Sequence, residues 1–194
     1  MPFDQIALCQ KMLGDIDRLE SEANEVFNKL VLPTWGGELH GFVETLYGYM
    51  LRVFSHIDLL SSYWRGSNKY QSMRMVDFMD EHMSHGREAH SVAVQVWRHQ
   101  LIHTAQPRPL KDPSSNKIIY WLLQWGDRHL PKEQHFTFSE TESQIILNLG
   151  ALYLIEDLRK SAAVYCDELS TSFPLQRNAD TFASKLASCM LKEY

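Results

Sequence analysis

The sequence lacks any long apolar run and any paired-cysteine motif. No stretch approaches the roughly 18 uninterrupted apolar residues that a membrane helix needs, and Met1 to Gln5 do not begin the basic-then-apolar pattern of an export signal. The three cysteines, Cys9, Cys166 and Cys189, are odd in number and form no Cys-x-x-Cys pair. These absences predict a cytoplasmic protein with reduced thiols and no membrane partner.

The composition also lacks any extreme bias. Hydrophobic residues make up 44% of the 194 residues and charged residues 22%, which excludes the compositions of disordered, collagen-like and disulfide-dense chains. The net charge is −5, so the whole surface does not carry the positive charge of a general nucleic-acid binder. The length suits one hydrophobic core, and we expect a single domain over residues 1–194.

Positive charge is concentrated in one segment. Between residues 85 and 117 the basic residues outnumber Glu88 and Asp112 and leave three net positive charges; they are Arg87, Arg98, Arg108, Lys111 and Lys117. Any nucleic-acid site must therefore be local. Within this segment, the candidate substrate-binding residues are Arg87, Arg108 and Lys111.

Helical periodicity covers most of the chain. Apolar residues recur at helical spacing over residues 4–31 and again over residues 39–64. Gly66 follows the second pattern and suits the left-handed position after a helix end. We expect these two helices to pair antiparallel as the first hairpin of an all-α, up-and-down bundle, with further helices over residues 70–83 and 87–104.

The periodicity changes to two after residue 117. Four apolar or aromatic residues at alternate positions would share one face of a strand: Ile119, Trp121, Leu123 and Trp125. Residues 135–138 alternate again, which predicts a small β-hairpin insert over residues 117–139. Ser139 and Glu142 then have capping-box spacing ahead of a helical pattern that ends near residue 169, and a last helix is expected over residues 178–191.

The strongest functional signal is an arginine followed by two histidines near the end of the 87–104 helix. Arg98, His99 and His103 form this run, and Pro107 and Pro109 prevent the helix from continuing much further. The run resembles the motif of the HEPN superfamily, in which Arg is followed by Asn, Asp or His and, after further residues, by His. Members of that superfamily are helical bundles of about this size.

The resemblance implies a metal-independent endoribonuclease, often part of toxins and defence systems, with Arg98, His99 and His103 as catalytic residues and no cofactor. Arg98 would clamp a phosphate and stabilise charge that develops on phosphorus. His103 would accept the proton of a ribose 2′-hydroxyl or donate one to the leaving 5′-oxygen, because histidine exchanges protons near neutral pH. Cyclic phosphate ends would result.

The spacing of the motif raises a geometric problem. Residues five apart in an α-helix lie roughly 140° around its axis, so Arg98 and His103 would not share one face. A twofold homodimer would let Arg98 of one chain face His103 of the other, and we expect such a dimer, with RNA or a cognate protein as further partners. Asp58 would orient a motif side chain if its helix packs against the motif helix.

Two other interpretations stay open. A non-catalytic helical module would bind a protein, nucleotide or RNA, with Arg98 contacting an anion. A metal-binding bundle would pair His99 with His103, which are four apart on one helical face, or would use a cluster around residue 86: His82, His85 and His90, with Asp80 or Glu81. The glutamate of the His-Glu-x-x-His zinc signature is missing, and we predict no metal in the candidate site.

Overall fold

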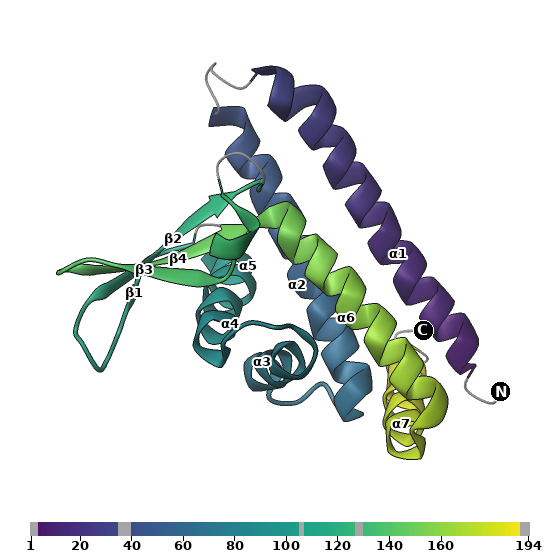
Figure 1. The fold of residues 1–194 in the computed structure, drawn as a ribbon. Helices are drawn as coiled ribbons and strands as arrows, with labels where there is room; N and C mark the ends of the chain where they lie inside the picture. The colour runs from purple at the N-terminus through teal and green to yellow at the C-terminus, as the bar shows by residue number, and fades with distance from the viewer. Residues whose placement is uncertain (1–3, 35–39, 105–106, 127–129, 191–194) are drawn as a thin grey trace.

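The computed structural model describes residues 4–34, 40–104, 107–126 and 130–190 (Figure 1). Helices make up most of this part, and a four-stranded sheet projects from one side of the helical bundle. The chain is therefore mostly helical, as the periodicity predicts. Within these ranges, no helix has both the length and the apolar character required to cross a membrane.

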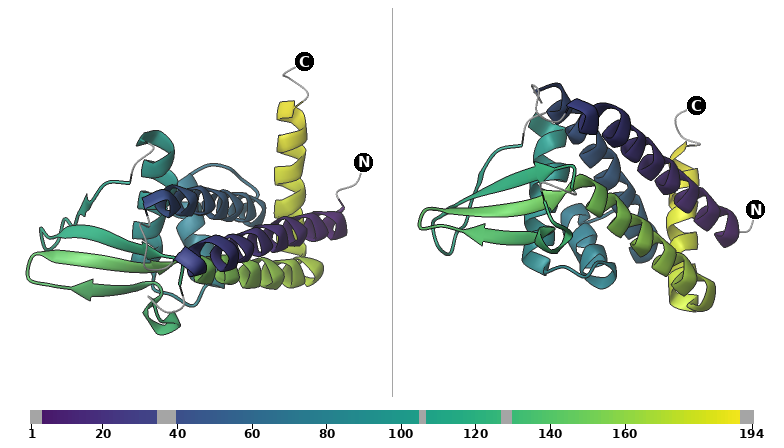
Figure 2. Two further views of the ribbon diagram at one scale, coloured as in Figure 1. Left: turned by 90° about the horizontal axis from the view of Figure 1, so that it is seen from above. Right: turned by 45° about the horizontal axis from the view of Figure 1, so that its top comes forward.

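Three long helices form the frame of the bundle. They are α1 (Gln5–Val26), which continues as a π-helical segment over Phe27–Val31, α2 (His40–Arg65) and α6 (Ala151–Thr171). α1 packs mainly against α6 and runs antiparallel to both α6 and α2 (Figures 1 and 2). Fully buried residues from all three helices, such as Ile16, Phe54 and Leu158, make the core between them. The expected antiparallel first pair is present, with α6 as an additional partner of α1.

Shorter helical segments surround this frame. They are α3 (Gln71–His82), α4 (Arg87–Ala93), the π-helical segment η3 (Val94–Gln100), α5 (Leu101–Thr104), α7 (Phe173–Met190) and two short 3-10 turns, Leu32–Thr34 and Lys132–Gln134. α4, η3 and α5 together are the expected 87–104 helix, which we call the motif helix. α7 begins earlier than expected and crosses the long helices (Figure 2).

The end of α2 is docked closely against α7. Gly66 has φ of +66°, which confirms the left-handed position predicted for it. Asn178 of α7 donates from Nδ2 to the carbonyl of Trp64 at 2.8 Å, and Lys185 donates from Nζ to the carbonyl of Gly66 at 2.9 Å. The last carbonyls of α2 thus find partners on α7.

The sheet is larger than the predicted hairpin. Its strands are β1 (Leu110–Lys111), β2 (Ile118–Gln124), β3 (Thr137–Glu140) and β4 (Gln144–Gly150), in the order β1-β2-β4-β3. β2 pairs parallel with β4, and the outer pairs are antiparallel. The expected capping box is also wrong, because Ser139 lies in β3 and α6 begins only after Gly150. The apolar run in β4 fits the period of a helix as well as that of a strand, and its pairing with β2 and β3 makes it a strand.

Two tryptophans of the alternating pattern at residues 119–125 contact the helical bundle. Trp121 lies against Trp97 of the motif helix, with ring centroids 5.8 Å apart. Trp125, just after the strand, is buried beside Phe27 and Tyr49. These tryptophans therefore pack the sheet onto the bundle.

Candidate functional site

The three motif residues lie together near the end of the motif helix. Arg98 and His99 are in η3, and His103 is in α5. The imidazole rings of His99 and His103 have centroids 4.9 Å apart, and both side chains are exposed. Arg98 is more protected, with 19% of its side chain exposed. The histidine pair thus faces solvent beside a half-buried guanidinium.

Asp58 of α2 tethers Arg98. Arg98 Nη2 donates to Asp58 Oδ2 at 3.4 Å, and the same carboxylate accepts hydrogen bonds from Gln71 and Arg74 in the first turn of α3. Asp58 therefore joins α3 to the motif helix. The expected contact between Asp58 and a motif side chain is confirmed.

Arg74 is the most buried cation of this group, with 3% of its side chain exposed. Its Nε donates to Ser61 Oγ at 3.0 Å, and its Nη1 donates to the carbonyl of Lys69 at 2.9 Å. Burial lowers the pKa of the Arg74 guanidinium, and the charge of Asp58 acts in the opposite direction. Asp58 thus compensates a buried positive charge while it also holds Arg98.

The tether uses only part of the Arg98 guanidinium, and 19% of the side chain is exposed. The contact with Asp58 uses one of the five N–H donors of this group. Among the described residues, Arg98 Nε has no hydrogen-bond partner although it is buried. A guanidinium anchored at one nitrogen, with further donors in a fixed plane, suits bidentate binding of a phosphate or carboxylate.

The π-helical segment changes the predicted geometry of the motif. In η3 the backbone bonds span five residues, as in the bond from the Leu101 N–H to the Val96 carbonyl. Wider turns bring residues five apart closer to one face than an α-helix does, so Arg98 and His103 are less divergent than expected. In the part of the chain that the structure describes, no contact joins these two side chains. A second subunit that completes the site remains a prediction.

The three candidate substrate-binding residues lie in different places. Arg87 begins α4 and forms ion pairs with Asp77 at 2.7 Å and Asp80 at 2.9 Å, roughly 16 Å of helix from Arg98 at 1.5 Å per residue. Arg108 lies beside the motif, because its backbone N–H donates to Gln100 Oε1 at 2.5 Å. Lys111 is exposed on the edge strand β1. The structure thus brings Arg108 to the site and places Arg87 at the other end of the helix.

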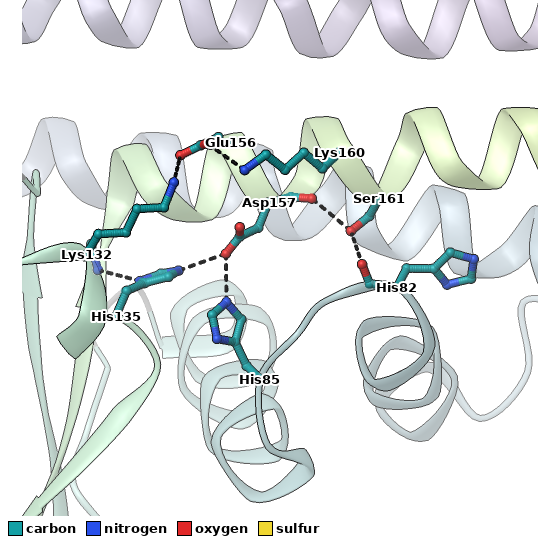
Figure 3. A network of polar contacts seen from close by, with 9 residues as sticks. His82, His85, Lys132, His135, Glu156, Asp157, Lys160 and Ser161 are labelled. Carbon is teal, nitrogen blue, oxygen red and sulfur yellow. Dashed lines mark hydrogen bonds and ion pairs between the residues drawn. The ribbon is translucent and has the colours of Figure 1, made fainter.

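A second group of titratable residues joins the sheet to the bundle (Figure 3). His85 precedes α4, His135 precedes β3, and Nε2 of each lies near Oδ2 of Asp157 in α6, at 2.8 Å and 3.1 Å. One ligand-type atom from each residue lies within 4.8 Å of the others. Of the predicted metal cluster only His85 belongs to this group. His82 instead contacts Glu168 at 3.2 Å.

The hydrogen bonding of His135 does not fit a metal ligand. The Gly150 N–H donates to His135 Nδ1 at 3.0 Å, which places the ring proton on Nε2, toward Asp157. Ligation through Nε2 requires that nitrogen to be unprotonated and Nδ1 to be a donor. We therefore assign His85, His135 and Asp157 as a hydrogen-bonded joint between the sheet and the bundle.

No protein-family model, curated protein or solved structure matches this chain. The resemblance to the HEPN superfamily therefore rests on Arg98, His99 and His103 and on the mostly helical fold around them. Their geometry, and that of Asp58, is the basis for the function proposed below.

The Asp58 tether makes a prediction about stability. We expect Asp58→Ala to lower the free energy of unfolding by roughly 3–5 kcal/mol, because it leaves the buried charge of Arg74 uncompensated. The matched control is Asp17→Ala, which removes an ion pair with Arg159 in which both side chains are more than half exposed and should cost less than about 1 kcal/mol. Urea denaturation measures both. Equal, small losses would contradict the compensating role of Asp58.

His135 of the sheet–bundle joint predicts sensitivity to acid. Burial lowers the pKa of His135, although its hydrogen bond with Asp157 acts in the opposite direction, and the charges of His85 and Lys132 also lower it. An unfolded chain protonates its histidines near pH 6.5. Below that pH the unfolded state binds a proton that the folded state does not, so stability decreases as the pH falls.

We expect the free energy of unfolding to decrease between pH 7 and pH 5 through His135, because the unfolded chain binds a proton in this range more readily than the buried imidazole does. His135→Gln keeps an acceptor for the Gly150 N–H and a donor for Asp157 but does not titrate. Urea denaturation across this pH range should therefore show a smaller acid loss for His135→Gln. The same loss in both proteins would exclude His135 as its source.

Proposed function

We propose that this chain is a metal-independent endoribonuclease of the HEPN type, acting through Arg98, His99 and His103. The observation that carries the proposal is a tethered, partly exposed guanidinium near two exposed imidazoles at one helix end. Phosphodiester cleavage needs a cation for the phosphate and proton-transferring groups that work near neutral pH. The Arg98 helix end offers both kinds of group.

In the proposed reaction Arg98 binds the non-bridging oxygens of the scissile phosphate. One imidazole accepts the proton of the ribose 2′-hydroxyl as its oxygen attacks phosphorus, and the other protonates the 5′-oxygen as its bond to phosphorus breaks. The products are a 2′,3′-cyclic phosphate and a 5′-hydroxyl end. Two imidazoles with ring centroids 4.9 Å apart support such a division between base and acid.

The test is cleavage of a mixed pool of single-stranded RNA in EDTA, with analysis of the product ends. We expect wild type to leave cyclic phosphates, and Arg98→Ala and His103→Ala each to lose at least about 100-fold in rate, the usual contribution of such groups. Arg18→Ala removes a guanidinium that is 70% exposed on α1 and should keep full activity. Melting temperatures of the variants separate loss of chemistry from loss of folding.

A measurement of binding to the same RNA pool, made beside the cleavage assay, separates the rival function. If wild type binds RNA without cleaving it, and Arg98→Ala abolishes that binding, the chain is a non-catalytic module. The Asp58 contact supports that alternative, because the carboxylate offsets part of the positive charge with which Arg98 would stabilise charge that develops on phosphorus. If wild type neither cleaves nor binds RNA, the proposal fails.

A mixing experiment tests the proposed homodimer. If Arg98 of one subunit works with His103 of the other, each mixed dimer of Arg98→Ala and His103→Ala chains contains one intact site and one site that lacks both groups. Unfolding and refolding the two inactive variants together should then restore about one quarter of the wild-type activity, because half of the dimers are mixed and half of their sites are intact. No recovery in dimers that have demonstrably exchanged would place the whole site in one subunit.

A further inference from the structure

A cavity of about 290 Å³ lies beside the residues that hold Arg98. It is formed by the end of α2, the connection after it and the first turns of α3, and we call it the α3 pocket. Three cations and one carboxylate are among its lining residues: Arg65, Ser67, Lys69, Tyr70, Met73, Arg74 and Asp77. The volume approaches the lower end of the range for small-molecule sites, which suits a group of about the size of one nucleotide.

The α3 pocket is linked directly to the candidate site. Arg74, which lines the pocket, donates to the same Asp58 carboxylate that contacts Arg98. Gln71, next in sequence to the lining residue Tyr70, also donates to Asp58. A residue of the pocket lining and the Arg98 guanidinium thus share the Asp58 carboxylate.

Positive charge in the α3 pocket exceeds negative charge. The Lys69 side chain is exposed, and among the described residues no ion pair involves its ammonium group. Arg65 pairs with Asp77 at 2.8 Å, and Asp77 also pairs with Arg87. Arg87 pairs with Asp80 as well, so the excess positive charge is that of Lys69. The hydrogen bond from Arg87 contributes most to holding the pKa of Asp77 below its usual value. An anionic group would therefore be attracted to Lys69, and Arg65 lines the same pocket.

Exposed apolar side chains accompany these cations. Tyr70 is 77% exposed and Met73 is 56% exposed, although both line the pocket. An exposed aromatic ring beside exposed cations is the combination that proteins use to hold single-stranded nucleic acids, because each base offers a face for stacking and each nucleotide carries a phosphate.

We propose that the α3 pocket binds the nucleotide next to the scissile phosphate of a single-stranded RNA, with Tyr70 stacking on the base and Lys69 and Arg65 contacting its phosphate. This inference rests on the proposed function. It makes Tyr70 and Lys69 substrate-binding residues that do not take part in bond breaking. Their loss should therefore raise KM and leave kcat unchanged.

The experiment measures binding and cleavage of the same short single-stranded RNA. Binding is followed by fluorescence anisotropy on an oligonucleotide whose 2′-hydroxyls are methylated, so that it cannot be cleaved. We expect Tyr70→Ala to raise Kd at least about fivefold, as loss of one stacked base does, and Tyr70→Trp to restore binding. Lys69→Ala should raise Kd and reduce the dependence of binding on salt.

The matched controls are Tyr120→Ala and Lys29→Ala. Tyr120 on β2 is 37% exposed, and Lys29 in the π-helical segment after α1 is 70% exposed. Both variants should bind as wild type does. If wild type cleaves the unmodified RNA but Tyr70→Ala keeps its Kd and KM, the pocket inference is overturned and the proposed function stands. If wild type binds RNA through Tyr70 but does not cleave it, the α3 pocket is a nucleotide-binding site without a neighbouring scissile phosphate, and the ribonuclease proposal fails.

Discussion

Asp58 accepts hydrogen bonds from the first turn of α3 and from the motif helix at the same carboxylate. A guanidinium as buried as that of Arg74 is tolerated only with a nearby opposite charge, because removal of an ion from water costs several kcal/mol. The ion pair between Arg74 and Asp58 therefore fixes α3 against α2, and the same Asp58 carboxylate orients Arg98. The candidate site and the α3 pocket consequently depend on one ion pair for their relative position.

A second polar joint performs a similar task for the sheet. Asp157 of α6 contacts His85 and His135, and the bond from the Gly150 N–H to His135 connects this group to the end of β4. Burial raises the pKa of Asp157, but the hydrogen bonds from the two histidines outweigh that effect and leave it well below the usual value. The joint therefore holds a charged carboxylate where the chain passes from sheet to helix, and it orients the sheet without a role in the proposed chemistry.

The sequence predicts the features of this chain that are local. Helical spacing locates α2 and α3, and the glycine at 66 marks a left-handed end, because each of these signals lies within a few residues. The role assigned to Arg98, His99 and His103 stays a prediction. β4 is missed because Ile145, Ile146 and Leu147 fit a helix as well as a strand, and the deciding partner is β2, many residues earlier. The contacts of Asp157 with His85 and His135 are missed for the same reason, since no local pattern marks residues that meet only after folding.

The position of Asp58 also bears on how a substrate could be enclosed. Asp58 occupies one side of the Arg98 guanidinium, while His99 and His103 face solvent, so a phosphate would approach Arg98 from outside the bundle. Electrostatic stabilisation is strongest where water is excluded, and an open helix end does not exclude it. A second copy of the motif helix, packed about a twofold axis, would supply that cover. The residues that line the α3 pocket come from the end of α2, the connection after it and α3, and not from the motif helix. The pocket would therefore stay open to receive the neighbouring nucleotide, which makes enclosure of the scissile phosphate compatible with binding of a longer strand.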